Sequence, residues 1–160
     1  MEKLEKQIKR WIAFFIAALF ISGLTAIPVK PEINFLYRMT GDISFIQPWI
    51  ERLHEGINET SVQYPFLFYG FDWLAFAHFV LAILFIGPFR DPVRNKWVIE
   101  FGMIACLLII PFALVAGHFR GIPLWWRLVD CSFGIIGLLS LGIVDKKMLQ
   151  LEKLQAKTEV

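Results

Sequence analysis

The sequence predicts an all-α integral membrane protein: a four-helix transmembrane bundle with an outer amphipathic helical loop. Apolar residues make up 57% of the 160 residues and charged residues only 19%, whereas soluble domains hold about 45–50% apolar and about 25% charged residues. The mean hydropathy is +0.59. Four stretches reach the length of about 18 apolar residues that a helix needs to cross a bilayer core. An ordinary soluble enzyme is therefore not expected.

The first two spans are bounded by charged residues and by proline. We expect the first span over residues 11–29, a stretch without charge. The N-terminal segment also fits a signal peptide cleaved after Ala26. However, the apolar run is longer than the usual length of about 7–15 residues, and Glu alternates with Lys before it, which favours a signal anchor. We expect the second span over residues 66–87, with Pro65 in the first helical turn and Pro88 closing the helix.

The third and fourth spans are expected over residues 97–117 and 125–144. Pro111 lies inside the third span and predicts a kink. Tryptophans lie at the span ends, where amphipathic rings prefer the headgroup region: Trp11, Trp97, Trp125 and Trp126. In residues 145–160, Leu and Met alternate with Lys and Glu from Asp145 to Lys157. We expect this stretch to continue the fourth helix as a solvated or headgroup-facing tail.

Residues 30–64 form the only long connection between spans. We expect a short helical turn after Pro31, a break at Gly41–Asp42 and a second helix beginning near Ser44. Apolar residues recur at helical spacing in that second helix: Ile46, Trp49, Ile50, Leu53 and Ile57. Such a helix could lie in the outer membrane interface, close over the bundle as a lid, or merely cap it. Asn58-Glu59-Thr60 matches a glycosylation sequon, a pattern that often arises by chance.

Lysine and arginine are distributed unequally between the two sides of the membrane. Eleven of the 16 fall on the side that holds both termini and the loop at residues 90–96. The other side holds five: Lys30, Arg38, Arg52, Arg120 and Arg127. The positive-inside rule therefore places both termini in the cytoplasm and residues 30–64 outside.

Two carboxylates inside the spans are the main candidate site residues. Counted from the outer end of their spans at about 1.5 Å per residue, Asp72 and Asp130 each lie about 8–9 Å below the outer face. A lone carboxylate is costly in hydrocarbon, so each should turn inward, toward the other or toward a common cavity. Asp130, Gly134 and Gly137 share one helix face, which places Asp130 on a small-residue stripe where helices approach closely.

Three cations lie at the rim just above these carboxylates: His118, Arg120 and Arg127. Together with Asp72 and Asp130 they could form a ligand-binding or proton-handling pocket. Alternatively, they could form a structural network in which Arg127 pairs with Asp130, while His118 or Arg120 pairs with Asp72. Both interpretations remain open from the sequence.

The remaining polar groups in the spans are expected to be structural. Glu100, three residues into the third span, should form an ion pair at the inner interface. His78 lies near the midplane and should bond to a backbone carbonyl or a hydroxyl. His118 lies about 15 Å or more above His78, which excludes a haem held by both. We expect Cys106 and Cys131 to be free thiols, and we expect no metal and no cofactor.

Four segments carry a resemblance to known proteins: residues 69–78 (YGFDWLAFAH), 87–94 (GPFRDPVR), 120–123 (RGIP) and 126–134 (WRLVDCSFG). Over residues 11–142 the chain resembles a family of small, uncharacterised bacterial four-span membrane proteins. This resemblance implies a bacterial inner-membrane location and no particular activity. The topology also looks like the sterol-isomerase and sigma-2-receptor-like four-helix group, an analogy of fold alone, in which membrane-embedded acidic residues bind amphiphilic ligands.

Three classes of function fit these observations. The leading class is a small membrane protein that binds a lipid or a hydrophobic small molecule in an outward-facing pocket. The second is a membrane enzyme that uses Asp72 or Asp130 as general acid or base with His118 nearby. The third is a proton-coupled or oligomeric transport component. Membrane lipids are expected partners and a homo-oligomer is left open, while a net charge of +2 gives no nucleic-acid footprint.

Overall fold

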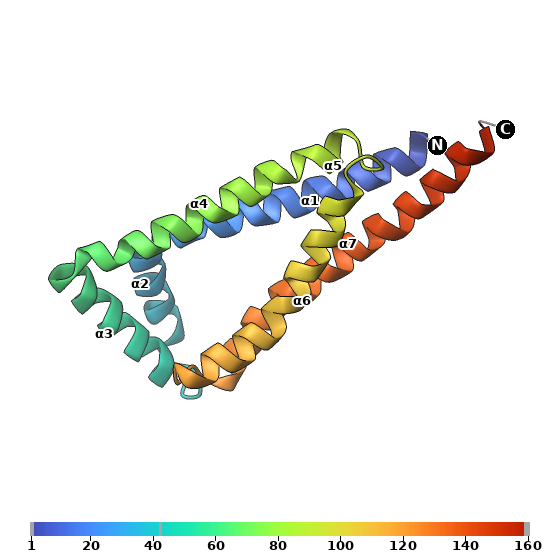
Figure 1. Cartoon of the computed structure of the whole chain (residues 1–160). Coiled ribbons are helices and arrows are strands. Elements are labelled where there is room, and N and C mark those ends of the chain that lie inside the picture. Colours follow the sequence, from blue (N-terminus) through green and yellow to red (C-terminus); the bar gives the residue numbers. More distant parts are fainter. Residues whose placement is uncertain (1, 42, 159–160) are drawn as a thin grey trace. The chain divides into compact units, whose positions relative to one another are not determined.

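The computed structural model describes residues 2–41 and 43–158, and Figure 1 shows that this part is almost entirely helical, with no strand in it. Its elements are α1 (Glu2–Ala26), α2 (Val29–Thr40), α3 (Gln47–Gln63), the 3-10 turn η1 (Pro65–Phe68), α4 (Tyr69–Leu84), α5 (Ile86–Arg90), α6 (Lys96–Phe119) and α7 (Leu124–Thr158). Four stretches are long and apolar enough to cross a membrane: Glu2–Ala26, Pro65–Arg90, Lys96–Phe119 and Leu124–Ala156. The predicted all-α, four-span membrane fold is confirmed.

The second span differs from the prediction at its inner end. Pro88 was expected to close the helix, but it is buried inside α5. The break instead falls at Phe85, between α4 and α5. A proline lacks the backbone N–H and its ring crowds the carbonyl four residues earlier, so the helix is interrupted before the proline itself.

The chain divides into two compact units, and each is described by itself. The packed unit comprises residues 1–18 and 82–160, which include most of α1 together with α5, α6 and α7. The hairpin unit comprises residues 19–81, which include the last turns of α1, then α2, α3, η1 and most of α4.

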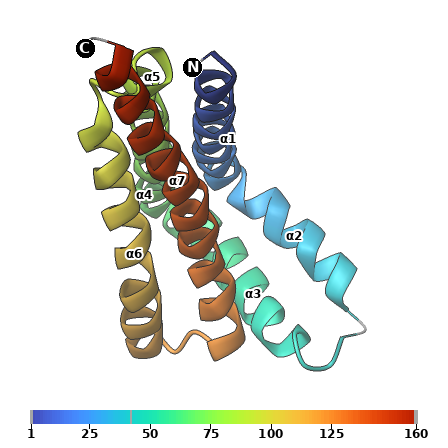
Figure 2. The same ribbon diagram turned by 90° about the vertical axis from the view of Figure 1, so that its right-hand side faces the viewer.

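In the packed unit, α7 lies along α6 (Figure 2). Buried residues on α7 recur at intervals of three and four: Gly134, Gly137, Leu141, Val144, Met148 and Leu151. This heptad spacing keeps one seam of a helix turned toward its partners. Helix α1 contributes Ile8, Ile12 and Phe15, and the Phe15 ring lies 4.7 Å from the Phe85 ring, centroid to centroid.

Helix α6 has two contrasting faces. The face that packs in the unit includes Gly102 and Cys106, both buried. The opposite face exposes large apolar side chains at intervals of three and four, between 44% and 83% exposed: Trp97, Phe101, Ile104, Leu108, Phe112, Val115 and Phe119. A soluble protein rarely exposes such a continuous apolar surface, whereas a membrane span presents it to lipid.

The C-terminal part of α7 was expected to be a solvated or headgroup-facing tail. It does continue the fourth helix, but one of its faces is packed, with Met148 and Leu151 at most 1% exposed. The Lys147 ammonium donates a hydrogen bond to Gln7 Oε1 on α1, at 2.6 Å. The tail therefore pairs with the start of α1 instead of standing alone.

The expected ion pair of Glu100 is not present among the described residues. Glu100 is exposed, and the nearby Lys96 pairs with Glu152 on α7 at 3.7 Å. The reason is that α7 runs on well beyond the predicted end of its span and brings a second carboxylate to the start of α6.

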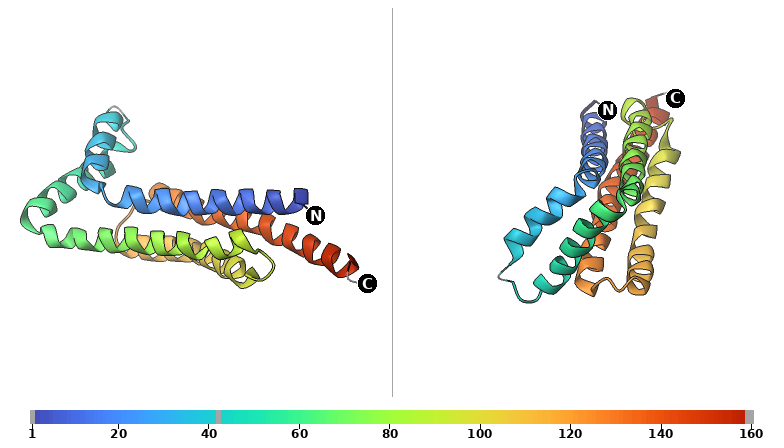
Figure 3. Two further views of the ribbon diagram at one scale, coloured as in Figure 1. Left: turned by 90° about the horizontal axis from the view of Figure 1, so that it is seen from above. Right: turned by 90° about the vertical axis from the view of Figure 1, so that its left-hand side faces the viewer.

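In the hairpin unit, α1 and α4 approach closely at Gly23. A Cβ at this position would lie 2.9 Å from the Phe79 ring and 3.0 Å from the Ala75 carbonyl oxygen, so only glycine allows the contact. From here α2 and α3 turn sharply away from the last turns of α1 and from α4, as Figures 1 and 3 show.

Helices α2 and α3 form an antiparallel hairpin held by two cross-helix hydrogen bonds and one ring stack. The Lys30 ammonium donates to Ser61 Oγ at 2.9 Å, Asn58 Nδ2 donates to Asn34 Oδ1 at 2.9 Å, and the Tyr37 and His54 rings stack at 4.2 Å. Asn58 Nδ2 also donates to the His54 carbonyl, so this amide is fully engaged and poorly placed for glycosylation. The two predicted helices of this loop are confirmed.

The bounds of these two helices differ from the prediction. The first extends over Val29–Thr40 and is much longer than a turn after Pro31, and the second begins at Gln47 instead of near Ser44. The predicted break falls at Gly41, while Asp42 lies outside the described residues.

Candidate functional site

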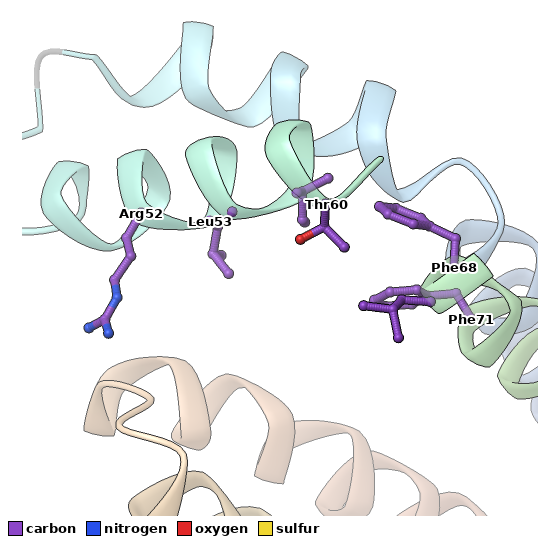
Figure 4. A pocket seen from close by; sticks show the side chains of 8 residues that line it. Arg52, Leu53, Thr60, Phe68 and Phe71 are labelled. Atoms are coloured by element: carbon purple, nitrogen blue, oxygen red, sulfur yellow. The ribbon is translucent and has the colours of Figure 1, made fainter. Parts of the chain in front are cut away.

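A groove lies in the corner between α3 and the start of the second span, entirely within the hairpin unit (Figure 4). Its volume is about 310 Å³, near the lower end of the range of about 300–1,000 Å³ that is typical of ligand pockets. Its lining consists of Arg52, Leu53, Gly56, Ile57, Thr60, Leu67, Phe68 and Phe71. Helix α3 contributes one continuous face, since its lining residues recur every three to four positions.

The corner forms because α3 ends next to a proline. Tyr64, the residue before Pro65, is pushed out of the helical conformation, with φ −137° and ψ 57°. Its N–H still donates to the Thr60 carbonyl at 2.8 Å, and its carbonyl accepts from Leu67 at 3.0 Å. The chain thus passes from α3 to η1 within one residue, and the side chains of η1 and α4 face those of α3.

The two ends of the groove differ in chemistry. Phe68 and Phe71 form an aromatic wall at one end, with ring centroids 5.6 Å apart. Arg52 lies toward the other end of α3 and points into the space beneath it, with Thr60 between it and the rings (Figure 4). Arg52 and Thr60 are eight residues apart on one helix, which corresponds to about 12 Å.

Asp72 does not line this groove. It lies in the first turn of α4, where the helix dipole favours a negative charge. Its side chain is exposed, in a shallow hollow formed with three aromatic residues of the same helix face: Tyr69, Trp73 and Phe76.

Asp130 lies in the packed unit, on the stripe of small residues that the sequence predicted. A Cβ on Gly134 would lie 2.6 Å from the Cys106 carbonyl oxygen, and one on Gly137 would lie 2.5 Å from Cys106 Sγ. The close approach of two helices at this stripe is therefore confirmed. Asp130 itself is half-buried, and its carboxylate makes no hydrogen bond or ion pair within the described part of the chain.

Arg127 is not paired with Asp130, contrary to the structural network considered from the sequence. Its side chain crosses to α6, where a Cβ on Gly117 would lie 2.5 Å from Arg127 Cδ. Its Nη1 donates to the Leu114 carbonyl at 3.0 Å. Arg127 therefore holds α7 against α6, and the missing side chain of Gly117 makes room for it.

The other two rim cations, His118 and Arg120, are exposed at the end of α6. The turn that follows them depends on Gly121, whose φ of +69° favours glycine. Since Asp72 belongs to one unit and Asp130, His118 and Arg120 belong to the other, a cavity shared by these residues stays a prediction.

Two expectations for the remaining polar groups are confirmed. His78 Nδ1 donates to the Leu74 carbonyl at 2.8 Å, as expected for a histidine satisfied by its own helix. Cys106 and Cys131 are buried free thiols. Among residues 2–41 and 43–158, no group of three or more His, Cys, Asp or Glu side chains could hold a metal ion.

Sequence reasoning did not identify the groove. It named Leu53 and Ile57 as apolar positions of an amphipathic helix, but it did not bring Arg52 together with Phe68 and Phe71. The available signal was Pro65: a proline directly after one helix and before a Phe-rich segment indicates a sharp corner lined by that segment.

Comparison of the chain with known protein families, with curated proteins and with solved structures found no match. The resemblance to bacterial four-span proteins and the analogy to the sterol-isomerase group therefore stay predictions.

Proposed function

We propose that this integral membrane protein binds a lipid or a hydrophobic small molecule in the groove between α3 and the start of the second span. The observation that carries the proposal is the groove lining: an aromatic and aliphatic floor with one hydroxyl and one cation. Ligand sites typically combine a mainly apolar concave surface with a few polar groups that fix orientation. Membrane lipids are the partners that a four-span protein meets at highest concentration.

The proposed location is the bacterial inner membrane, with both termini in the cytoplasm and the groove on the outer side. The support is the ratio of eleven to five Lys and Arg residues between the two sides. A cysteine placed at Glu2 should resist a membrane-impermeant thiol reagent in intact cells and react after lysis. Reaction in intact cells would reverse the orientation and put the groove on the inner side.

A variant that fills the groove tests the binding proposal. Gly56 lines the groove, and a Cβ there meets nothing within 4 Å. Gly56→Phe should therefore fold normally and fill the space that the ligand would occupy. We expect the purified full chain to bind a lipid carrying fluorescent acyl chains, and Gly56→Phe to weaken that binding at least about tenfold, equivalent to about 1.4 kcal/mol.

The matched control is Gly142→Phe. Gly142 lies in α7 of the packed unit and does not line the groove, and a Cβ there likewise meets nothing within 4 Å. It should leave lipid binding unchanged. Equal lipid affinity of the two variants and the wild type would show that this groove is not the binding site.

A further inference from the structure

The charge of the groove comes from one side chain. Among the described residues that line it, Arg52 alone is charged. Two ion pairs occur in the described part of the chain, Lys6–Glu2 and Lys96–Glu152, so the Arg52 guanidinium is not neutralised by a neighbouring carboxylate. Glu51 and Glu55 are close to it in sequence but contribute nothing to the lining.

The shape of the groove separates this cation from the apolar end. Arg52 lies about 12 Å along α3 from Thr60, and the Phe68 and Phe71 rings lie beyond Thr60 (Figure 4). A ligand that uses both ends of the groove therefore offers a hydrocarbon part to the rings and a negative group to Arg52. A neutral hydrocarbon would use only the apolar floor, and a small anion would use only the exposed guanidinium of Arg52.

The geometry points to an amphiphile with an anionic headgroup, a phosphate or a carboxylate, as the ligand of this groove. Arginine suits that headgroup because its planar fork donates two parallel hydrogen bonds to a phosphate or carboxylate. The hydrocarbon lies on Leu67, Phe68 and Phe71, and Thr60 offers a hydroxyl between the two ends. This inference rests on the proposed function and adds the class of ligand to it.

The test measures headgroup preference instead of binding alone. The full chain, purified in a neutral detergent, is titrated with dioleoyl phosphatidylglycerol and with dioleoylglycerol, which has the same acyl chains but no phosphate, and bound lipid is counted by native mass spectrometry. We expect the wild type to prefer the anionic lipid about tenfold, as one charge-assisted hydrogen-bonded contact would give. Arg52→Gln should bind both lipids equally, with affinity for dioleoylglycerol unchanged.

Arg38→Gln is the matched control, because Arg38 is an exposed arginine on α2 that does not line the groove. It should keep the preference, which excludes an effect of total charge. An unchanged preference in Arg52→Gln would overturn the inference while leaving the proposed function intact. Failure of the wild type to bind either lipid would overturn both.

A competition experiment distinguishes a site for a lipid headgroup from a site for a free anion. Inorganic phosphate at millimolar concentration should not displace phosphatidylglycerol from the wild type, since the apolar floor contributes to binding. Displacement by phosphate alone would identify a simple anion site and contradict the assignment of an amphiphile.

Discussion

The packed unit and the hairpin unit are stabilised in different ways. In the packed unit, α6 and α7 meet through glycines and apolar side chains, and the contact at Gly134 brings their backbones close together. In the hairpin unit, α2 and α3 are joined by polar side chains such as Asn34 and Asn58 and bury only one isoleucine each, Ile33 and Ile50, and a groove remains open beside them. The α6–α7 contact itself is closely packed, whereas the sharp corner beside the hairpin leaves the groove open.

The difference also indicates which of the two units opens locally at lower free energy. Burying a large apolar side chain contributes about 1.5–3 kcal/mol, whereas one hydrogen bond contributes about 0.5–1.5 kcal/mol net. The hairpin is therefore expected to open locally at lower free energy than the α6–α7 seam. Binding regions are commonly drawn from the less stable parts of a protein.

The largest expected effect comes from breaking the α6–α7 contact. Gly134→Leu would place a Cβ 2.6 Å from the Cys106 carbonyl oxygen, a backbone atom that cannot move aside alone. We expect a loss of about 3 kcal/mol or more in the free energy of unfolding. Thermal unfolding in detergent measures it, with Gly142→Leu as the control because its Cβ meets nothing. A similar melting temperature for both variants would contradict the close-packed seam.

The next effect concerns the C-terminal part of α7. Met148 and Leu151 are at most 1% exposed, whereas Leu149 on the same turn is 40% exposed. Leu151→Ala should destabilise the packed unit by about 2–4 kcal/mol, and Leu149→Ala by much less. Equal destabilisation of the two variants in thermal unfolding would contradict the packed tail and support the solvated tail expected from the sequence.

A smaller and local effect is expected in the hairpin. Asn58→Ala removes both of its hydrogen bonds, to Asn34 and to the His54 carbonyl. The expected loss is about 1–2 kcal/mol, confined to the hairpin. Hydrogen exchange should become faster in α2 and α3 and stay unchanged in α6 and α7. Equally faster exchange in both units would mean that they do not open independently.

The sequence predicts the fold better than it predicts the site. Span lengths and the spacing of Asp130, Gly134 and Gly137 depend on local helical geometry, which the sequence records directly. The partner of Arg127 is not set by local helical geometry. The spacing along α7 suggested Asp130, but the side chain reaches α6 because Gly117 leaves room there. That choice depends on which helix lies alongside α7. The spacing of residues along a single helix does not give this information.

The groove was missed for a related reason. Its lining combines α3 with η1 and α4, which come together only because the chain turns at Tyr64 and Pro65. The sequence favours carboxylates as site residues because a charge in hydrocarbon is costly, so a carboxylate kept within a span usually has a role. Asp72 instead lies at the start of α4, where the helix end itself favours its charge.

The central proposal, that the groove of the hairpin unit holds a lipid specifically, is tested most directly by mapping a bound lipid. The full chain in membrane vesicles is irradiated with phosphatidylglycerol that carries a diazirine in its acyl chain, and the labelled peptides are identified by mass spectrometry. The same mapping on Gly56→Phe separates the groove from the general lipid-facing surface. We expect labelling of residues 52–71 to be enriched in the wild type and to fall selectively in Gly56→Phe, with labelling of α6 unchanged. Uniform labelling of all four spans, or equal labelling of residues 52–71 in both proteins, would contradict the claim.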